Sequence, residues 1–239
     1  MFDVLVYSPA VRWAVRFAVP SEVRYWLTLL LFWPTVLLAR LRSWLAPAWR
    51  RKWDRITPSV VLGVVPAFRS DVDALRSGEG GVAVVNCCRE WHGHAGPSGL
   101  YAQKRLAVLH LPTIDWDVPR VDDLLAGAAF IHSHARSGAS TYVHCKAGRG
   151  RSTCVVLAYL VLVEGLAPRE AHDRIAARRP HVSKKWAAAE VRAVWELRQA
   201  LDRARAAPAF LRAVAAAGDC AVPGVAAVVR GKILLVANN

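Results

Sequence analysis

Cys145 and Arg151 are the residues whose types and spacing point most directly to catalysis. A β-branched run at 141–143 precedes the cysteine, a loop with two glycines separates it from the arginine, and a helix-like run at 153–163 follows. This order is typical of phosphate binding, because loop N–H groups point inward and the helix N-terminus adds positive potential. Both glycines are expected to open backbone conformations closed to other residues. We predict a phosphate site formed by Lys146, Ala147, Gly148, Arg149, Gly150 and Arg151.

The side chains of this loop predict a defined chemistry. The pKa of Cys145 should be strongly lowered, because the field that binds phosphate also stabilises a thiolate. Arg151 offers a planar fork for two phosphate oxygens. We expect Ser152 to donate a hydrogen bond to the sulfur as it leaves, and His144 to order the loop through its ring nitrogens without acting as the base. The implied reaction is attack of the thiolate on phosphorus, a cysteinyl-phosphate intermediate, and hydrolysis.

The composition narrows the partners and the compartment. The 239 residues carry 32 Lys and Arg against 18 Asp and Glu, a net charge of +14, which favours an anionic partner such as nucleic acid, anionic lipid or a phosphorylated ligand. A working thiolate requires a reducing compartment, so we expect a cytoplasmic or matrix-facing catalytic domain. No disulfide framework is expected from Cys87, Cys88, Cys145, Cys154 and Cys220.

Residues 1–52 differ in composition from the rest and predict membrane association. Six of the ten tryptophans lie within the first 53 residues, mixed with arginines, and residues 25–39 carry no charge. Fifteen residues fall short of the ~20 that a spanning helix needs, and Pro34 interrupts them. Flanking tryptophans and arginines are typical of an interfacial segment. Spanning, re-entrant and surface-lying arrangements all stay open, as does a helix packed against the domain. Arginines after the segment would keep a spanning protein's catalytic domain on the cytoplasmic side.

The remainder predicts an α/β catalytic domain at 53–206 and a C-terminal apolar extension of unknown role at 207–239. Strands alternate with helices, which indicates a mostly parallel central sheet flanked by helices, with the site at the carboxyl ends of the strands. We expect loops at 90–101 and 112–119, a turn at 78–81, and a helix that holds Val72 and Leu75. The predicted strands are 60–65, 82–86, 106–111 and 141–144; the other predicted helices are 121–137, 153–164, 168–178 and 184–205.

The loop resembles the signature of cysteine-dependent protein tyrosine and dual-specificity phosphatases, His-Cys-x-x-Gly-x-x-Arg-Ser. Four blocks of the sequence read WDRITPSVVLG, VNCCREW, LPTID and YVHCKAGRGRS. Over roughly residues 53–200, these blocks are similar to those of the mitochondrial-type phosphatidylglycerophosphate phosphatases and their bacterial and plant relatives. The resemblance implies removal of the terminal phosphate of phosphatidylglycerophosphate.

The second of these blocks departs from the family pattern. Relatives often carry paired glutamates there, whereas this sequence reads Asn-Cys-Cys-Arg before the single Glu90. The resemblance assigns Glu90 the supporting role of ordering an arginine near the site.

The leaving alkoxide needs a proton, which an aspartic acid on a mobile loop supplies in this mechanism. Asp115 and Asp117 both lie in the predicted loop at 112–119. Asp115 precedes Cys145 by thirty residues, a spacing similar to that of compact dual-specificity phosphatases, so we favour Asp115 and place Asp117 second. Asp122 and Asp123 are expected to cap the following helix.

Several other readings compete with the lipid phosphatase. The same chemistry would serve a protein tyrosine, dual-specificity or phosphoinositide phosphatase, or an enzyme acting on RNA 5′ ends; a membrane-tethered binding module is the non-enzymatic reading. We expect an anionic phospholipid or another phosphorylated substrate, a membrane surface as partner, and no nucleic acid, because no aromatic-interleaved basic surface follows the N-terminal segment.

Two further constellations carry weaker signals. His92 and His94 with the neighbouring cysteines lack the spacing of a zinc site, so no metal and no cofactor is expected. A basic cluster is expected to be a solvated face or to line the headgroup side of the pocket; it comprises Arg178, Arg179, His181, Lys184 and Lys185.

Overall fold

A five-stranded β-sheet organises the molecule, in a computed structural model that describes residues 18–45, 51–77, 83–92 and 99–216. The strand order is β1-β2-β5-β3-β4. β1 pairs with β2 antiparallel, and all other neighbours pair parallel, so the predicted mostly parallel α/β sheet is confirmed. The strands are β1 (Trp53–Thr57), β2 (Val60–Gly63), β3 (Ala83–Cys88), β4 (Ala107–Thr113) and β5 (Thr141–His144).

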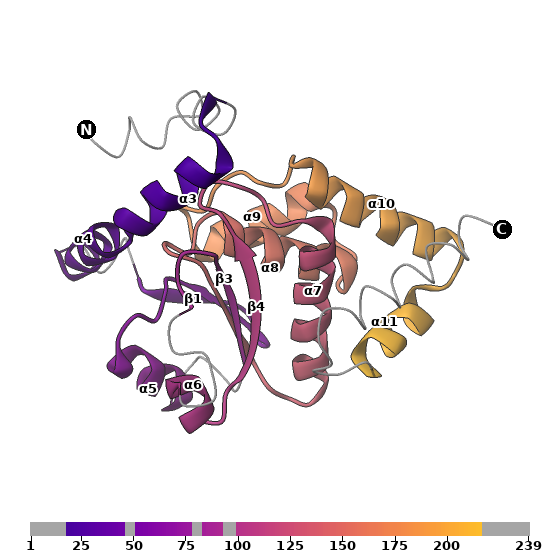
Figure 1. Cartoon of the computed structure of the whole chain (residues 1–239). Helices are drawn as coiled ribbons and strands as arrows, with labels where there is room; N and C mark the ends of the chain where they lie inside the picture. Colours follow the sequence, from indigo (N-terminus) through magenta and orange to yellow (C-terminus); the bar gives the residue numbers. More distant parts are fainter. Residues whose placement is uncertain (1–17, 46–50, 78–82, 93–98, 217–239) are drawn as a thin grey trace.

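The inner strands are buried on both faces because helices cover them. Every residue of β2, β3 and β5 is buried, as expected for parallel strands rich in valine. Figure 1 shows one group of helices on one side of the sheet and α5 (Arg69–Ser77) and α6 (Leu100–Gln103) on the other. That group comprises α7 (Val121–Arg136), α8 (Arg151–Leu162), α9 (Pro168–Arg178), α10 (Ala189–Arg203) and α11 (Ala207–Ala216).

Most element predictions agree with the structure, with instructive differences. The helix at 168–178 and the strand at 141–144 match α9 and β5. β1 was missed, and the helix expected from residue 184 begins at Ala189, because the Ser183 amide donates to the Arg149 carbonyl at 2.7 Å and holds this stretch against the phosphate loop. The predicted turn at 78–81 and the end of the C-terminal extension, 217–239, lie outside the described residues.

Two helices of the N-terminal segment pack on the sheet domain. They are α3 (Ser21–Leu30) and α4 (Phe32–Leu45), which lie next to each other in Figure 1. Phe32 and Val36 are buried in the core, where Phe32 stacks on Trp91 with ring centroids 6.4 Å apart. Across the described ranges, no helix has the length and apolarity needed to cross a membrane.

The outward side of these two helices is strongly apolar. Trp44 is 77% exposed, Leu30 74% and Trp26 64%. Further exposed apolar side chains on α3 and α4 are Val23, Leu27, Leu29, Trp33, Leu37, Leu38, Leu41 and Leu45. We call this set, with Trp26, Leu30 and Trp44, the apolar face. So many exposed apolar side chains on two neighbouring helices are unusual for a protein fully surrounded by water.

Candidate active site

The loop between β5 and α8 has the geometry of a phosphate cradle. Gly150 precedes the first residue of α8, so the loop curls around the N-terminus of a fully buried helix. Gly148 has a φ of +62°, and a Cβ there would collide with the Gly63 carbonyl group of β2. Gly150 has a φ of −120°, and a Cβ there would meet open space. The expectation of a backbone conformation closed to other residues therefore holds for Gly148, whereas the φ of Gly150 is negative.

Cys145 lies at the floor of this loop, with 3% of its surface exposed. The Ser152 hydroxyl donates a hydrogen bond to its sulfur at 3.2 Å. Burial raises the pKa of the thiol, but the Arg151 charge and the hydrogen bonds from Ser152 outweigh it, so the pKa of Cys145 lies below its ordinary value. The sulfur therefore ionises more readily than that of an ordinary cysteine.

Arg151 is fixed in the site by a buried carboxylate. Its two terminal nitrogens donate to the two oxygens of Glu90 at 2.7 and 2.8 Å, and Nη1 also donates to the Thr113 carbonyl at 2.8 Å. This two-point contact with Arg151 agrees with the role that the resemblance implies for Glu90, which is to order an arginine near the site. The Nε of Arg151 has no hydrogen-bond partner within the described part of the chain, which leaves one donor for a bound oxyanion.

Asp115 reaches the same place from the loop after β4. Its carboxylate lies 3.0 Å from the Arg151 guanidinium and 2.7 Å from the Lys146 ammonium. Burial favours the neutral acid, but these two cations outweigh it and hold the pKa of Asp115 well below its usual range. Lys146, in turn, is largely buried, and the pKa of its ammonium is raised because the Asp115 charge outweighs desolvation.

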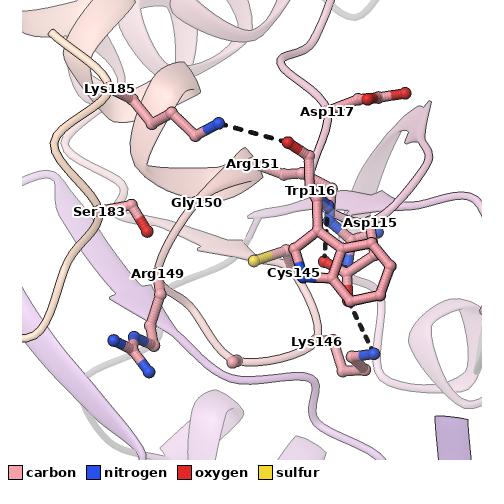
Figure 2. A pocket seen from close by; sticks show the side chains of 11 residues that line it. Asp115, Trp116, Asp117, Cys145, Lys146, Arg149, Gly150, Arg151, Ser183 and Lys185 are labelled. Carbon is pink, nitrogen blue, oxygen red and sulfur yellow. Dashed lines mark hydrogen bonds and ion pairs between the residues drawn. The ribbon is translucent and has the colours of Figure 1, made fainter. Parts of the chain in front are cut away.

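Asp117, the second candidate acid, faces elsewhere. Figure 2 shows its carboxylate directed away from Cys145, and it forms a 2.7 Å ion pair with Arg24 of α3. Asp122 and Asp123 lie in the first turn of α7, but the residue at the helix boundary is Arg120, with no side-chain cap. The capping expectation is confirmed for Asp123, whose carboxylate accepts a hydrogen bond from the Arg120 backbone amide, and the charges of both residues suit the positive end of the helix.

His144 differs from expectation in how it is held. Neither ring nitrogen has a hydrogen-bond partner among the residues that the structure describes. The ring lies between Trp91 and Tyr142, with centroids 5.6 and 5.7 Å away. Burial lowers the pKa of His144 to about 3, so the ring stays neutral.

One pocket collects the proposed reacting groups (Figure 2). Lys185 donates to the Trp116 carbonyl at 3.3 Å across its mouth, and Arg149 donates to the His181 carbonyl at 2.8 Å. The lining comprises Asp115, Trp116, Asp117, Cys145, Lys146, Ala147, Arg149, Gly150, Arg151, Ser183 and Lys185.

Comparisons with known proteins agree with this geometry. The family model for the catalytic domain of dual specificity phosphatases matches residues 77–190. Phosphatidylglycerophosphatase and protein-tyrosine phosphatase 1 of Homo sapiens is 36% identical over 156 residues, which cover 64% of this chain and 77% of that protein. The chain belongs to the dual-specificity phosphatase family.

Other members of the dual-specificity phosphatase family are also similar. Phosphatidylglycerophosphate phosphatase PTPMT2 of Arabidopsis thaliana is 40% identical over 155 residues, covering 64% of this chain and 66% of that protein. Phosphatidylglycerophosphate phosphatase PTPMT1 of the same plant is 39% identical over 70% of this chain, but only 48% of that protein is covered. A crystal structure of PTPMT1 in complex with PI(5)P has a TM-score of 0.56 at 25% identity, over 64% of this chain and 99% of that one.

One buried pair that supports the loop of this dual-specificity phosphatase was not predicted. Arg179 donates to the carbonyls of Gly148 and Ala147 at 2.9 and 3.2 Å, and forms a 2.7 Å ion pair with Asp54 of β1. Arg179 was expected in a solvated basic cluster, yet it is 1% exposed. The sequence signal was Asp54 inside the first resemblance block, because a buried carboxylate requires a cation.

Proposed function

We propose that this protein is a phosphomonoester hydrolase that works through a cysteinyl-phosphate intermediate. The observation that carries the proposal is the convergence of the Cys145 sulfur, the Arg151 guanidinium and the Asp115 carboxylate on one pocket lined by the phosphate loop. Two of these groups are prepared for their roles in the free site, since the pKa of the Cys145 thiol is lowered and the Arg151 guanidinium is held in place by Glu90.

In the first step, the Cys145 thiolate attacks phosphorus in line with the leaving oxygen. An S–P bond forms as the P–O bond to the alcohol breaks. Arg151 Nε and the loop N–H groups stabilise the equatorial oxygens, where charge is held in the transition state. Lys146, Ala147, Gly148, Arg149 and Gly150 contribute the remaining loop backbone and positive charge.

Asp115 protonates the leaving alkoxide in this proposal. In the free site its carboxylate is ionised, because Arg151 and Lys146 pair with it. A bound phosphate brings two negative charges beside Asp115 and competes for both cations. Both effects raise the pKa of the carboxyl group, so substrate binding itself loads the acid with a proton.

In the second step, water attacks the phosphorus of the intermediate and the S–P bond breaks. The Asp115 carboxylate, which gave up its proton in the first step, accepts one from the water. The Ser152 hydroxyl, 3.2 Å from the sulfur, stabilises the departing thiolate. Inorganic phosphate then leaves and the thiolate is restored.

The substrate we propose is phosphatidylglycerophosphate, with phosphatidylglycerol as product. Relatives at 36–40% identity carry that activity in their names. The apolar face of α3 and α4 supports a substrate held in a bilayer, and we propose that this face rests on an anionic membrane surface. On this proposal residues 1–52 attach the protein, and 53–206 form the catalytic domain in a reducing compartment; the cysteines of the described ranges are all free.

A second candidate substrate class is favoured by specific observations. One similar structure contains PI(5)P, and the human relative's name includes protein-tyrosine phosphatase. The second candidate is therefore a phosphoinositide or phosphotyrosine phosphatase with the same mechanism.

A substrate panel separates these candidates. The purified full chain is assayed with phosphatidylglycerophosphate in vesicles, PI(5)P in vesicles, a phosphotyrosine peptide and RNA 5′-triphosphate. We expect the highest kcat/KM on phosphatidylglycerophosphate. Faster turnover of the peptide would overturn the lipid assignment, and no turnover of any substrate would overturn the enzymatic proposal.

A further inference from the structure

We infer that Arg24 of α3 is a positioning residue for the general acid: it holds the loop that carries Asp115 to the helix that bears the apolar face. The inference rests on the proposed function, because it assigns a task within the proton-transfer step. It concerns a residue outside the region that the family model matches.

Arg24 is buried and bound to the acid loop through Asp117. It is 7% exposed although α3 lies at the surface of the domain. Nη1 donates to Asp117 at 2.7 Å, and Nε donates to the Val19 carbonyl at 3.2 Å, so the guanidinium is held from both ends. An arginine this buried without its carboxylate partner would carry a large desolvation cost, which makes the pairing with Asp117 specific.

The loop needs such an external support. Trp116, between Asp115 and Asp117, has a φ of +70°, a strained conformation for a bulky residue. Its amide donates to the Asp115 carboxylate at 3.1 Å, and the Asp117 amide donates to the Ile114 carbonyl at 3.2 Å. This tight turn aims the acid, and it persists only where surrounding contacts hold it.

Two cations hold the turn from outside it. Lys185 binds the Trp116 carbonyl from the segment before α10, and Arg24 binds the Asp117 side chain from α3. The Lys185 bond is longer, at 3.3 Å, and comes from a lysine at the pocket mouth. The charge-assisted bond from the buried Arg24 is the stronger of the two supports.

The same helix faces outward with Val23, Trp26 and Leu30, which are all exposed. A second contact holds α3 on the domain: the Arg89 guanidinium carbon lies over the Tyr25 ring, 4.5 Å from the ring centroid. One short helix therefore joins the proposed membrane contact to the proposed acid. Arg24 is the residue on it that reaches the acid loop.

The test compares substrates with poor and good leaving groups. Loss of a general acid slows departure of a glycerol alkoxide, whereas the phenolate of 4-nitrophenyl phosphate leaves without a proton. The rate of alcohol release in a single turnover isolates the first step, because water attack on the intermediate comes later and is the same for both substrates. We expect Arg24→Ala to lower this rate on phosphatidylglycerophosphate vesicles by about tenfold or more, and on 4-nitrophenyl phosphate by less than about twofold. Arg24→Lys, which keeps a cation for Asp117, should recover most of the loss.

Asp117→Ala should reproduce the effect of Arg24→Ala. The double variant should be no slower than either single variant, because both remove the same contact. Arg40→Ala is the matched control: it removes an arginine from α4 that pairs with Asp71, not with the acid loop, and should leave the ratio of the two single-turnover rates unchanged.

The outcomes separate this inference from the proposed function. If the wild-type protein hydrolyses the lipid but Arg24→Ala changes both single-turnover rates of alcohol release equally, or Arg24→Lys is no better than Arg24→Ala, the positioning role is wrong. A wild-type protein that does not hydrolyse the lipid overturns the proposed substrate. In that case the ratio measured with glycerol 3-phosphate in place of the lipid still decides the role of Arg24.

Discussion

Burial and positive charge act in opposite directions on the thiols of this protein, and the balance differs from one cysteine to the next. Burial raises the pKa of Cys88 well above its ordinary value and that of Cys154 to about 12. Cys145 is also buried, yet its pKa is lowered, because Arg151 and Ser152 act directly on its sulfur. Selective reactivity at one of several buried cysteines thus follows from one guanidinium and one hydroxyl.

This balance predicts the pH dependence of alkylation at Cys145. Because its pKa lies below that of an ordinary thiol, the rate of reaction with iodoacetamide should reach half of its plateau at a lower pH than the rate for a free cysteine does. Arg151→Ala removes the lowering charge and keeps the burial, so the midpoint should move to higher pH. Peptide mass spectrometry locates the label. A wild-type midpoint at or above that of a free thiol would contradict the proposed nucleophile.

At the scale of elements, three strand and helix ends fix the phosphate loop. β5 delivers Cys145, α8 begins at Arg151, and the end of β2 closes against the turn at Gly148. Arg179, anchored by Asp54 of β1, holds two loop carbonyls from the far side. With these carbonyls bound on the outside, the loop N–H groups are expected to face a bound phosphate.

Two glycines of the loop allow a matched comparison. Gly148→Ala should destabilise the fold by about 1–3 kcal/mol and nearly abolish turnover, because its φ is +62° and a Cβ would strike Gly63. Gly150→Ala should change stability by less than about 0.5 kcal/mol, because no atom is near the new methyl group. Thermal unfolding and kcat on 4-nitrophenyl phosphate measure both. Equal effects of the two changes would contradict the geometry given for the loop.

Sequence reasoning found the elements with strong local patterns and missed those fixed by distant contacts. The β-branched strand before Cys145 and the Pro-initiated helix α9 were predicted because their signals are local. β1 was missed because its five residues include Asp54 and Arg55 and lack a long apolar run. Arg179 looked like a solvated cation because its partner lies 125 residues away.

The residues of the site likewise fall into those predicted from a local motif and those whose contacts only the structure shows. Cys145, Arg151 and Asp115 were predicted from the signature and its spacing, and the structure brings them into one pocket. The ion pair between Arg24 and Asp117 joins residues 93 positions apart, and no motif in the sequence marks it. Glu90 was identified through the family pattern, but its fork on Arg151 becomes visible only when β3 and α8 are placed side by side.

At the scale of the whole molecule, we expect membrane binding to depend on where the apolar surface lies as well as on the net charge of +14. The apolar face occupies α3 and α4, and Figure 1 shows these helices on the side of the sheet domain away from α10 and α11. A positively charged protein with one apolar face is expected to bind an anionic bilayer in a single orientation.

Membrane binding can be tested with two variants that each add one negative charge, at different positions. Leu30→Glu puts a carboxylate in the centre of the apolar face, where Leu30 is 74% exposed. It should weaken binding to phosphatidylglycerol vesicles in a flotation assay by about tenfold or more. Gln199→Glu adds the same charge at an exposed position of α10 and should bind nearly as the wild type does. Equal loss in both variants would show that net charge alone drives binding.

Direct detection of phosphate on Cys145 tests the central claim, that this sulfur forms a covalent bond to phosphorus during turnover. The protein is mixed with phosphatidylglycerophosphate or 4-nitrophenyl phosphate, quenched rapidly, and digested for mass spectrometry. We expect a phosphoryl group on the peptide that contains Cys145, formed within the first turnover and absent from Cys145→Ser. Turnover without such an adduct, or with the phosphoryl group on another residue, would contradict it.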